Sequence, residues 1–230
     1  MKTWIAPVVG VALAALGQSV TAQVGYPPNH SPFHDLEYSQ EVTILGGTFH
    51  AHRDPADVAP QSGTISGVHY EWRPSGPVEL IGEFAHISSD RRIINPFKAG
   101  TAREVGTTSR PLYALDAGIG MSLPGGKSWH RLVPELQAGM GFISDLKVQP
   151  DTGGFRFGTR FAFNMGAGIK YVPAGHWQVR ADLLDRFYTI AYPETFYTAP
   201  TGGTAVVGAA QARSFWTNNP ALTLGLSYLF

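Results

Sequence analysis

His86 and Ser88 are the two residues whose types and spacing come nearest to a catalytic arrangement. Residues two apart on a strand point to the same face, where a histidine can take the proton of a serine hydroxyl and make it a nucleophile. Such a pair also needs a third group that orients the histidine. Glu83 and Asp90 are nearby carboxylates, but neither has a spacing that assigns it this role. We therefore interpret the pair as polar residues near a strand end, with nucleophilic catalysis as the alternative.

Three histidines have the chemistry of metal ligands. His50 and His52 are two apart, and His69 belongs to the next predicted strand. Imidazole nitrogens are common zinc ligands, and the two-residue spacing places two of them on one face. No carboxylate is spaced to complete the site. We expect these histidines at the bases of loops or in the upper interior of the fold, and we predict no metal ion and no cofactor.

Charged residues of both signs fall in the predicted strands, on the parity opposite to the apolar residues. They are Glu71, Glu79, Glu83, Asp116, Glu135, Lys170, Arg180, Asp182 and Arg186. If the strands enclose them they must be paired, because an unpaired buried charge is costly. They form either a path for ions or a structural ion-pair network. A narrow interior favours the network, with pairs such as Arg180 and an interior carboxylate.

Eight segments of alternating apolar and small or polar residues would position these side chains. They cover residues 37–52, 67–72, 78–88, 113–123, 132–142, 161–171, 177–183 and 221–230. In the last segment every second residue, from Leu222 to Phe230, is large and apolar or aromatic, which is the period of a strand. The apolar residues of the first segment do not keep one parity. We predict eight strands, with the orientation of the first one open.

The connections between these strands alternate in length. Residues 73–77, 124–130 and 173–176 form short turns, whereas residues 53–62, 89–109, 144–154 and 188–213 form longer loops. Short turns at one end and long loops at the other are typical of an up-and-down membrane barrel.

The face opposite the apolar one distinguishes a membrane barrel from a soluble barrel or a β-sandwich. It consists mainly of Gly, Ala, Ser and Asn with scattered charges, and glycine contributes 27 of 230 residues. Small residues with compensating charges suit the interior of an eight-stranded barrel, whereas a water-facing side would be richer in charged residues. The sequence therefore predicts an all-β protein, an eight-stranded antiparallel up-and-down transmembrane β-barrel.

The first residues predict export. Lys2 precedes an apolar stretch from Val8 to Leu16, and Val20 and Ala22 are small residues that fit a signal-peptidase site. We predict a signal peptide over residues 1–22, an irregular proline-rich leader over residues 23–36 and the barrel over residues 37–230. The expected location is the outer membrane.

Composition excludes several classes of function. The chain has no cysteine, so it has neither disulfides nor thiolate chemistry. Lys plus Arg equal Asp plus Glu at 17 each, so nothing predicts a nucleic-acid partner. We expect a monomer.

A signal peptide, about eight amphipathic strands and a last strand ending on Phe230 resemble the OmpA-like and OmpX-like family of small outer-membrane β-barrels. The resemblance covers nearly the whole mature chain and is one of pattern. It implies that the C-terminal strand, with Tyr228 and Phe230, is the signal that the barrel-assembly machinery reads. The function it implies is a structural or surface-interaction role in the cell envelope.

Two alternatives remain open. The His86-Ile87-Ser88 sequence resembles the His-x-Ser pair of outer-membrane lipid A deacylases, which are also eight-stranded barrels. In that family the pair lies late in the chain and an Asn follows it, whereas here it lies early and Ser89 follows. The other alternative is a narrow channel for small solutes.

Membrane lipid and lipopolysaccharide are the expected surroundings. The second long loop carries five basic residues that suit lipopolysaccharide phosphates if the loop faces outside, although a solvated loop is the interpretation we favour. They are Arg91, Arg92, Lys98, Arg103 and Arg110.

Overall fold

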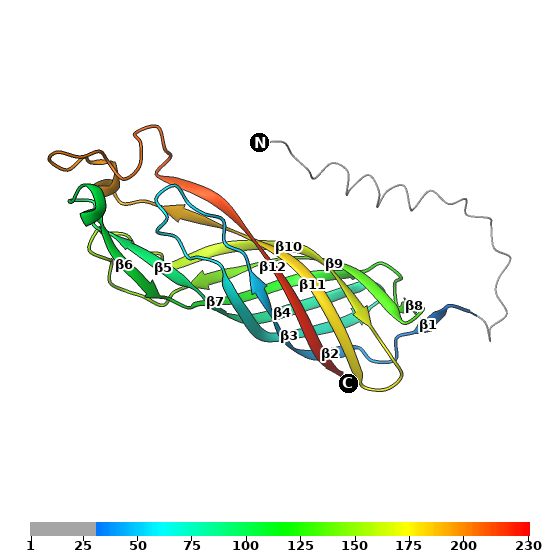
Figure 1. The fold of residues 1–230 in the computed structure, drawn as a ribbon. Coiled ribbons are helices and arrows are strands. Elements are labelled where there is room, and N and C mark those ends of the chain that lie inside the picture. Colours follow the sequence, from blue (N-terminus) through cyan, green and yellow to red (C-terminus); the bar gives the residue numbers. More distant parts are fainter. Residues whose placement is uncertain (1–30) are drawn as a thin grey trace. The chain divides into compact units, whose positions relative to one another are not determined.

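Eight long antiparallel strands form a closed barrel in the computed structural model, which describes residues 31–230 (Figure 1). The strands are β2 (Gln40–Phe49), β3 (Gly63–Ser75), β4 (Val78–Ser88), β7 (Leu112–Ser122), β9 (Leu132–Ser144), β10 (Thr159–Tyr171), β11 (Trp177–Ala191) and β12 (Ser214–Leu229). Each pairs with its neighbours in sequence, and β12 pairs with β2 to close the sheet. The predicted eight-stranded antiparallel fold is confirmed. The predicted signal peptide and residues 23–30 of the leader lie outside the described residues.

The closing seam involves the last residue. Phe230 N donates to Gln40 O at 2.9 Å, and Gln40 N donates to Phe230 O at 3.1 Å. The two terminal strands therefore hold each other, and the barrel has no free edge at this seam.

The structure also sets the orientation of β2. Glu41, Thr43, Leu45 and Phe49 are buried inside the barrel, whereas Ile44 points outward. The apolar residues of β2 do not keep one parity because the barrel interior is polar toward the short turns and apolar toward the long loops, and β2 passes from the first part to the second. Leu45 and Phe49 enter the apolar part.

Several segments differ from the sequence prediction. The loop predicted over residues 89–109 contains a hairpin of β5 (Asp90–Ile94) and β6 (Glu104–Ser109), with the short 3-10 helix η2 (Gly100–Arg103) between them. β11 runs to Ala191, into the loop predicted over residues 188–213, and the 3-10 helix η3 (Glu194–Tyr197) follows it. β12 begins at Ser214, at the end of that loop and ahead of the predicted segment 221–230. The hairpin was missed because neither strand alternates apolar and polar residues, since β5 places Arg91 beside Arg92 and Ile93 beside Ile94.

A short strand also occupies part of the leader predicted to be irregular. β1 (Phe33–Asp35) pairs with β8 (Lys127–Trp129), which lies in a predicted turn. Three residues are too few for a period-two pattern to stand out. Within residues 31–230 no helix is long and apolar enough to cross a membrane.

The outside of the barrel is apolar. Ile44, Leu115 and Leu224 are 71%, 63% and 68% exposed, and most outward positions of the other strands carry similar residues. Aromatic side chains are exposed near both ends. Those toward the short turns are Trp72, Trp129, Tyr171, Trp177 and Tyr228, and those toward the long loops include Phe142, Phe161, Phe163 and Trp216.

The interior has two zones. Toward the long loops it is filled by apolar side chains from the strands, such as Ile87, Leu112 and Ile143, together with side chains from the loops. Phe155 and Phe196 belong to the latter and are 2% and 0% exposed. We call this packed zone the loop cap; it lies at the left in Figure 1. Toward the short turns the interior is charged.

Tyr192 and Asp54 fasten two loops of the cap. Tyr192 Oη donates to Asp54 Oδ2 at 2.5 Å, and the same carboxylate accepts from the backbone N–H groups of Ala56 and Ala59. Burial, together with the hydrogen bond to Asp54, raises the pKa of the Tyr192 phenol. The phenol therefore remains a neutral donor over the physiological pH range.

Replacing Tyr192 with phenylalanine is expected to loosen the cap without unfolding the barrel. The Asp54 carboxylate loses one partner while it stays buried, which costs about 1–3 kcal/mol. The rate of trypsin cleavage at Arg53 in the folded protein would measure this opening. Tyr197→Phe is the control, because that hydroxyl donates to the carbonyl of Ala212 in an exposed position. Equal cleavage rates in both variants would contradict the role of the Tyr192–Asp54 bond.

Candidate functional site

The charged interior is built from every barrel strand except β12. β2 supplies Glu41, β3 supplies His69 and Glu71, and β4 supplies Glu79 and Glu83. The remaining contributions are Asp116 from β7, Glu135 from β9, Lys170 from β10, and Arg180, Asp182 and Arg186 from β11. In each strand these residues take the inward parity, so period-two geometry alone directs them to the interior.

Arg180 is the centre of the part of this network that lies nearest the short turns. Its Nη1 lies 2.8 Å from Glu41 Oε1 and 3.1 Å from Glu71 Oε2. Its Nη2 lies 2.5 Å from Glu135 Oε1, and its Nε lies 2.8 Å from Asp182 Oδ2. The side chain is fully buried, and its planar guanidinium distributes five donors among four carboxylates.

Glycines make room for this arrangement. Gly225 stands opposite Arg180 in the ladder, and a Cβ at that position would lie 2.5 Å from Thr43 Cγ2 and 3.0 Å from Arg180 Cγ. A Cβ on Gly168 would lie 2.3 Å from Asp182 Oδ1. Small residues on the inward face therefore hold the space into which the long charged side chains extend.

Lys170 is the second buried cation. Its Nζ forms an ion pair with Glu71 and lies 2.8 Å from Glu135 Oε2, 3.4 Å from Glu79 Oε2 and 3.6 Å from Glu41 Oε2. An ammonium group has three donors, so it cannot satisfy four carboxylates fully.

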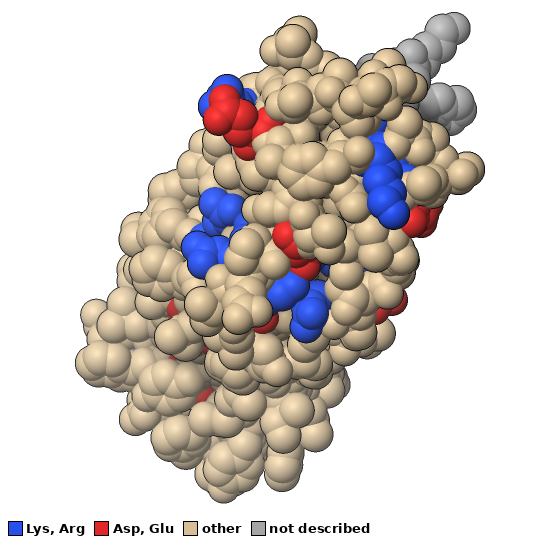
Figure 2. Space-filling view, turned by 90° about the vertical axis from the view of Figure 1, so that its left-hand side faces the viewer, with Lys and Arg blue, Asp and Glu red and all other residues tan. Residues whose placement is uncertain are grey.

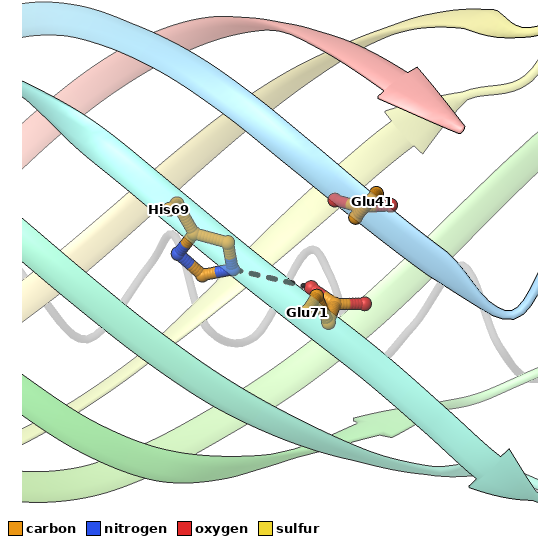
Figure 3. A group of neighbouring side chains, drawn as sticks. All are labelled: Glu41, His69 and Glu71. Atoms are coloured by element: carbon orange, nitrogen blue, oxygen red, sulfur yellow. Dashed lines mark hydrogen bonds and ion pairs between the residues drawn. The ribbon is translucent and has the colours of Figure 1, made fainter. Parts of the chain in front are cut away.

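His69 connects this lower network to a second one. Its Nε2 lies 3.2 Å from Glu71 Oε2, and its Nδ1 lies 3.1 Å from Glu83 Oε2. Arg186 in turn pairs with Glu83 and lies 3.1 Å from Asp116 Oδ2. Figure 3 shows His69 and Glu71 on β3, with Glu41 on the neighbouring strand. The charged groups thus form one continuous chain of contacts along the barrel.

Carboxylates outnumber cations in this network. Seven acidic side chains face Lys170, Arg180, Arg186 and the imidazole of His69. The interior therefore carries an excess of acidic groups in a place where an uncompensated charge is costly.

All nine charged residues predicted from the sequence lie in this interior. Sequence reasoning missed Glu41, because the parity of its strand was open. Its alternation with the outward residues Val42 and Ile44 was the signal that could have identified it. Sequence reasoning also grouped His69 with His50 and His52 as candidate metal ligands, whereas in the structure His69 contacts Glu71 and Glu83.

The three histidines are not brought together. His50 and His52 are exposed beyond the end of β2, and His69 is buried beside Glu71. Two other groups have ligand atoms within 4.8 Å of one another, namely Glu41 with His69 and Glu71, and Glu71 with Glu79 and Glu135. Most of these carboxylates already bind Arg180 or Lys170 closely, so a metal ion would have to displace part of the network.

His86 and Ser88 face the outside of the barrel. They share the parity of the exposed Phe84, and the His86 ring lies 5.3 Å from the ring of Tyr113. No carboxylate of residues 31–230 makes a hydrogen bond or ion pair to His86; Glu83 points inward to Arg186. The pair lacks the third group that nucleophilic catalysis needs.

The basic residues of the second loop are largely used within the cap. Arg91 is 1% exposed, with its Nη1 2.6 Å from Asp151 Oδ2. Arg92 Nη1 lies 2.8 Å from Asp57 Oδ2, and Arg103 donates to backbone carbonyls. Figure 2 views this end and shows basic groups beside acidic ones. The expectation of a fully solvated loop is therefore wrong for Arg91, because its guanidinium packs over Phe155.

The barrel is similar to several solved outer-membrane barrels. Neisserial surface protein A is 13% identical, with a TM-score of 0.47 over 87% of this chain and 98% of that one. The N-terminal β-barrel domain of OprF from Pseudomonas aeruginosa is 16% identical, with a TM-score of 0.45 over 84% and 98%. Ail from Yersinia pestis, solved with the heparin analogue sucrose octasulfate, is 14% identical, with a TM-score of 0.42 over 85% and 100%. No family model and no curated protein matches the sequence.

Proposed function

We propose that the chain is an exported outer-membrane β-barrel with a structural or surface-interaction role in the cell envelope. The observation that carries this function is the inverted distribution of side chains. Charged residues such as Arg180 and Lys170 are buried inside, whereas large apolar residues such as Leu224 cover the outside.

This distribution suits lipid rather than water. Monomeric soluble proteins rarely expose a contiguous apolar surface larger than a few hundred Å². A bilayer accepts strands only when their backbone groups pair within a closed barrel, and every barrel strand here has two partners. The exposed aromatic residues at both ends correspond to the two interfaces of a membrane.

The packed interior favours a structural or surface role over conduction. The loop cap fills the upper half with buried apolar side chains, and the lower half is crossed by ion pairs. In the usual orientation of such barrels the short turns face the periplasm and the long loops face outside. The loop cap is then the part that meets lipopolysaccharide and other surface partners, and the last strand, with Tyr228 and Phe230 outward, is available to the assembly machinery.

Expression of the full chain in a Gram-negative host, followed by separation of the membranes by density, tests this function. We expect the protein in the outer-membrane fraction, with a gel mobility that changes on boiling as the barrel unfolds. A variant that lacks residues 1–22 is the control and should remain in the cytoplasm. Recovery of the full chain from the soluble periplasmic fraction would contradict the proposed location.

A further inference from the structure

The loop between β9 and β10, residues 145–158, exposes large apolar side chains at the end of the barrel that the loop cap closes (Figure 1). Leu146 and Val148 are 68% and 78% exposed, although they lie beyond the last residue of β9 and not on the barrel wall. Leu146 also has a φ of 54°, in the left-handed region that is costly for a leucine. A side chain so exposed compensates this cost poorly through contacts within the folded chain.

This loop is held firmly in its position. Asp145 Oδ1 accepts hydrogen bonds from the backbone N–H groups of Lys147 and Gly158, both at 3.1 Å, and so joins the two ends of the loop. On the inward side, Phe155 and Phe157 are 2% and 1% exposed and pack in the loop cap. The loop therefore presents a fixed set of side chains to its surroundings.

Two arginines lie beside the exposed apolar residues. Arg156 is exposed, and its Nη1 donates to the carbonyl oxygen of Val148 at 3.0 Å. Arg160 Nη2 donates to the carbonyl oxygen of Arg156 at 3.3 Å, and its Nε has no partner among residues 31–230. Within the same residues neither guanidinium forms an ion pair with a carboxylate. The loop thus combines uncompensated positive charge with exposed apolar surface.

The barrel wall below the loop indicates what lies next to it. Phe142 and Phe161 face outward as a pair across β9 and β10, with ring centroids 5.8 Å apart. One step toward the loop, the hydroxyls of Ser144 and Thr159 are 2.9 Å apart. Exposed aromatic residues at this end correspond to a membrane interface in the proposed location. The β9–β10 loop then lies at the level of the lipid head groups, where anionic groups and acyl chains meet.

We propose that the β9–β10 loop binds the phosphorylated head group of lipid A, with Arg156 and Arg160 on a phosphate and with Leu146 and Val148 against the acyl chains. This inference rests on the proposed outer-membrane role and names the lipid that one loop recognises. A guanidinium suits phosphate because it donates several hydrogen bonds in a fixed planar geometry. Two neighbouring arginines suit a phosphate monoester, because it carries more charge than the diester of an ordinary phospholipid.

A single fluorescent label tests this site. The chain has no cysteine, so Val148→Cys provides one attachment point for a polarity-sensitive dye. The full chain is refolded in phosphatidylcholine vesicles, and folding is confirmed by the change in gel mobility on boiling. We expect the dye emission to move to shorter wavelength when the vesicles also contain diphosphoryl lipid A. Lipid A without its phosphates should have no such effect.

The outcomes separate the site from the proposed function. A folded barrel whose dye does not respond to lipid A would overturn the site and leave the envelope role intact. An equal response to phosphatidylglycerol would indicate general attraction to anionic lipid and would also overturn the assignment to lipid A. A chain that does not fold into vesicles at all would contradict the envelope role, and the site with it.

Two surface cations provide a matched pair of variants in the labelled protein. Arg156→Gln should raise the lipid A content needed for half of the emission change by about 10-fold, because charge-assisted hydrogen bonds are lost. Lys98→Gln removes the same charge from an exposed side chain in the β5–β6 hairpin, and should change that content by less than about 2-fold. Equal weakening in both variants would mean that overall charge attracts the lipid, and would refute the site.

Leu146→Gly tests the apolar half of the site. Glycine adopts a positive φ readily, so this variant should be at least as stable as the parent in vesicles without lipid A. Its response to lipid A should nevertheless weaken by about 5-fold, because the leucine side chain no longer contacts the acyl chains. A Leu146→Gly variant with an unchanged response would show that the exposed leucine has no lipid contact, and would overturn the site as proposed.

Discussion

Replacing Arg180 with methionine is expected to lower the free energy of unfolding by about 3–5 kcal/mol, because removal of one partner leaves buried charges uncompensated. Glu41, Glu135 and Asp182 would all lose their closest cation. Methionine has a similar length and no charge, so it fills much of the volume next to Gly225. Urea unfolding of the refolded barrel in lipid vesicles, followed by tryptophan fluorescence, measures the change.

Arg213→Met is the control for this substitution. Arg213 pairs with Glu194 at 3.1 Å, but both side chains are largely exposed, so the loss should be about 1 kcal/mol or less. Similar losses in the two variants would mean that the interior ion pairs contribute no more than a surface pair. A double variant, Arg180→Met with Glu135→Gln, should recover part of the loss because one uncompensated charge is removed.

Replacing Leu224 with arginine is expected to destabilise the barrel in lipid by about 2–4 kcal/mol, the cost of a cation near the middle of the bilayer. Leu224 is 68% exposed and lies within β12, opposite Ala181 on one side and Gly46 on the other. The same substitution on a water-exposed surface usually changes stability by no more than about 0.5 kcal/mol. This variant therefore separates a lipid-facing exterior from a water-facing one.

Thr201→Arg provides the comparison, because Thr201 is exposed in the loop that follows η3. It should leave the unfolding midpoint in vesicles unchanged. If Leu224→Arg is as well tolerated as Thr201→Arg, the apolar belt does not face lipid, and the proposed location would have to be abandoned.

The eight strands could be predicted from the sequence because period two is a local property of the chain. Leu224 outward and Arg180 inward follow from counting along one strand, and so does the outward direction of His86 and Ser88, which share the parity of Phe84. The predicted strands were less accurate where the alternation of apolar and polar residues changes. β2 passes from the charged zone of the interior to the loop cap, so its inward residues change from polar to apolar. For this reason its parity stayed open and Glu41 was not predicted to face inward.

The partners of each charge were decided by the tertiary structure. Arg180 on β11 meets Glu41 on β2 and Glu135 on β9, although neither strand pairs with β11. Such contacts cross the interior, so they depend on the closure of the sheet and on the register of every strand between them. The loop cap and the interior charged network have the same origin, since Tyr192 meets Asp54, and Glu79 meets Lys170, from distant parts of the sequence. Outside β2, the sequence by itself determined which strand side chains face inward, because that needs only the alternation of one strand. Which of them meet inside required the closed barrel, because the distance across it is fixed by all eight strands together.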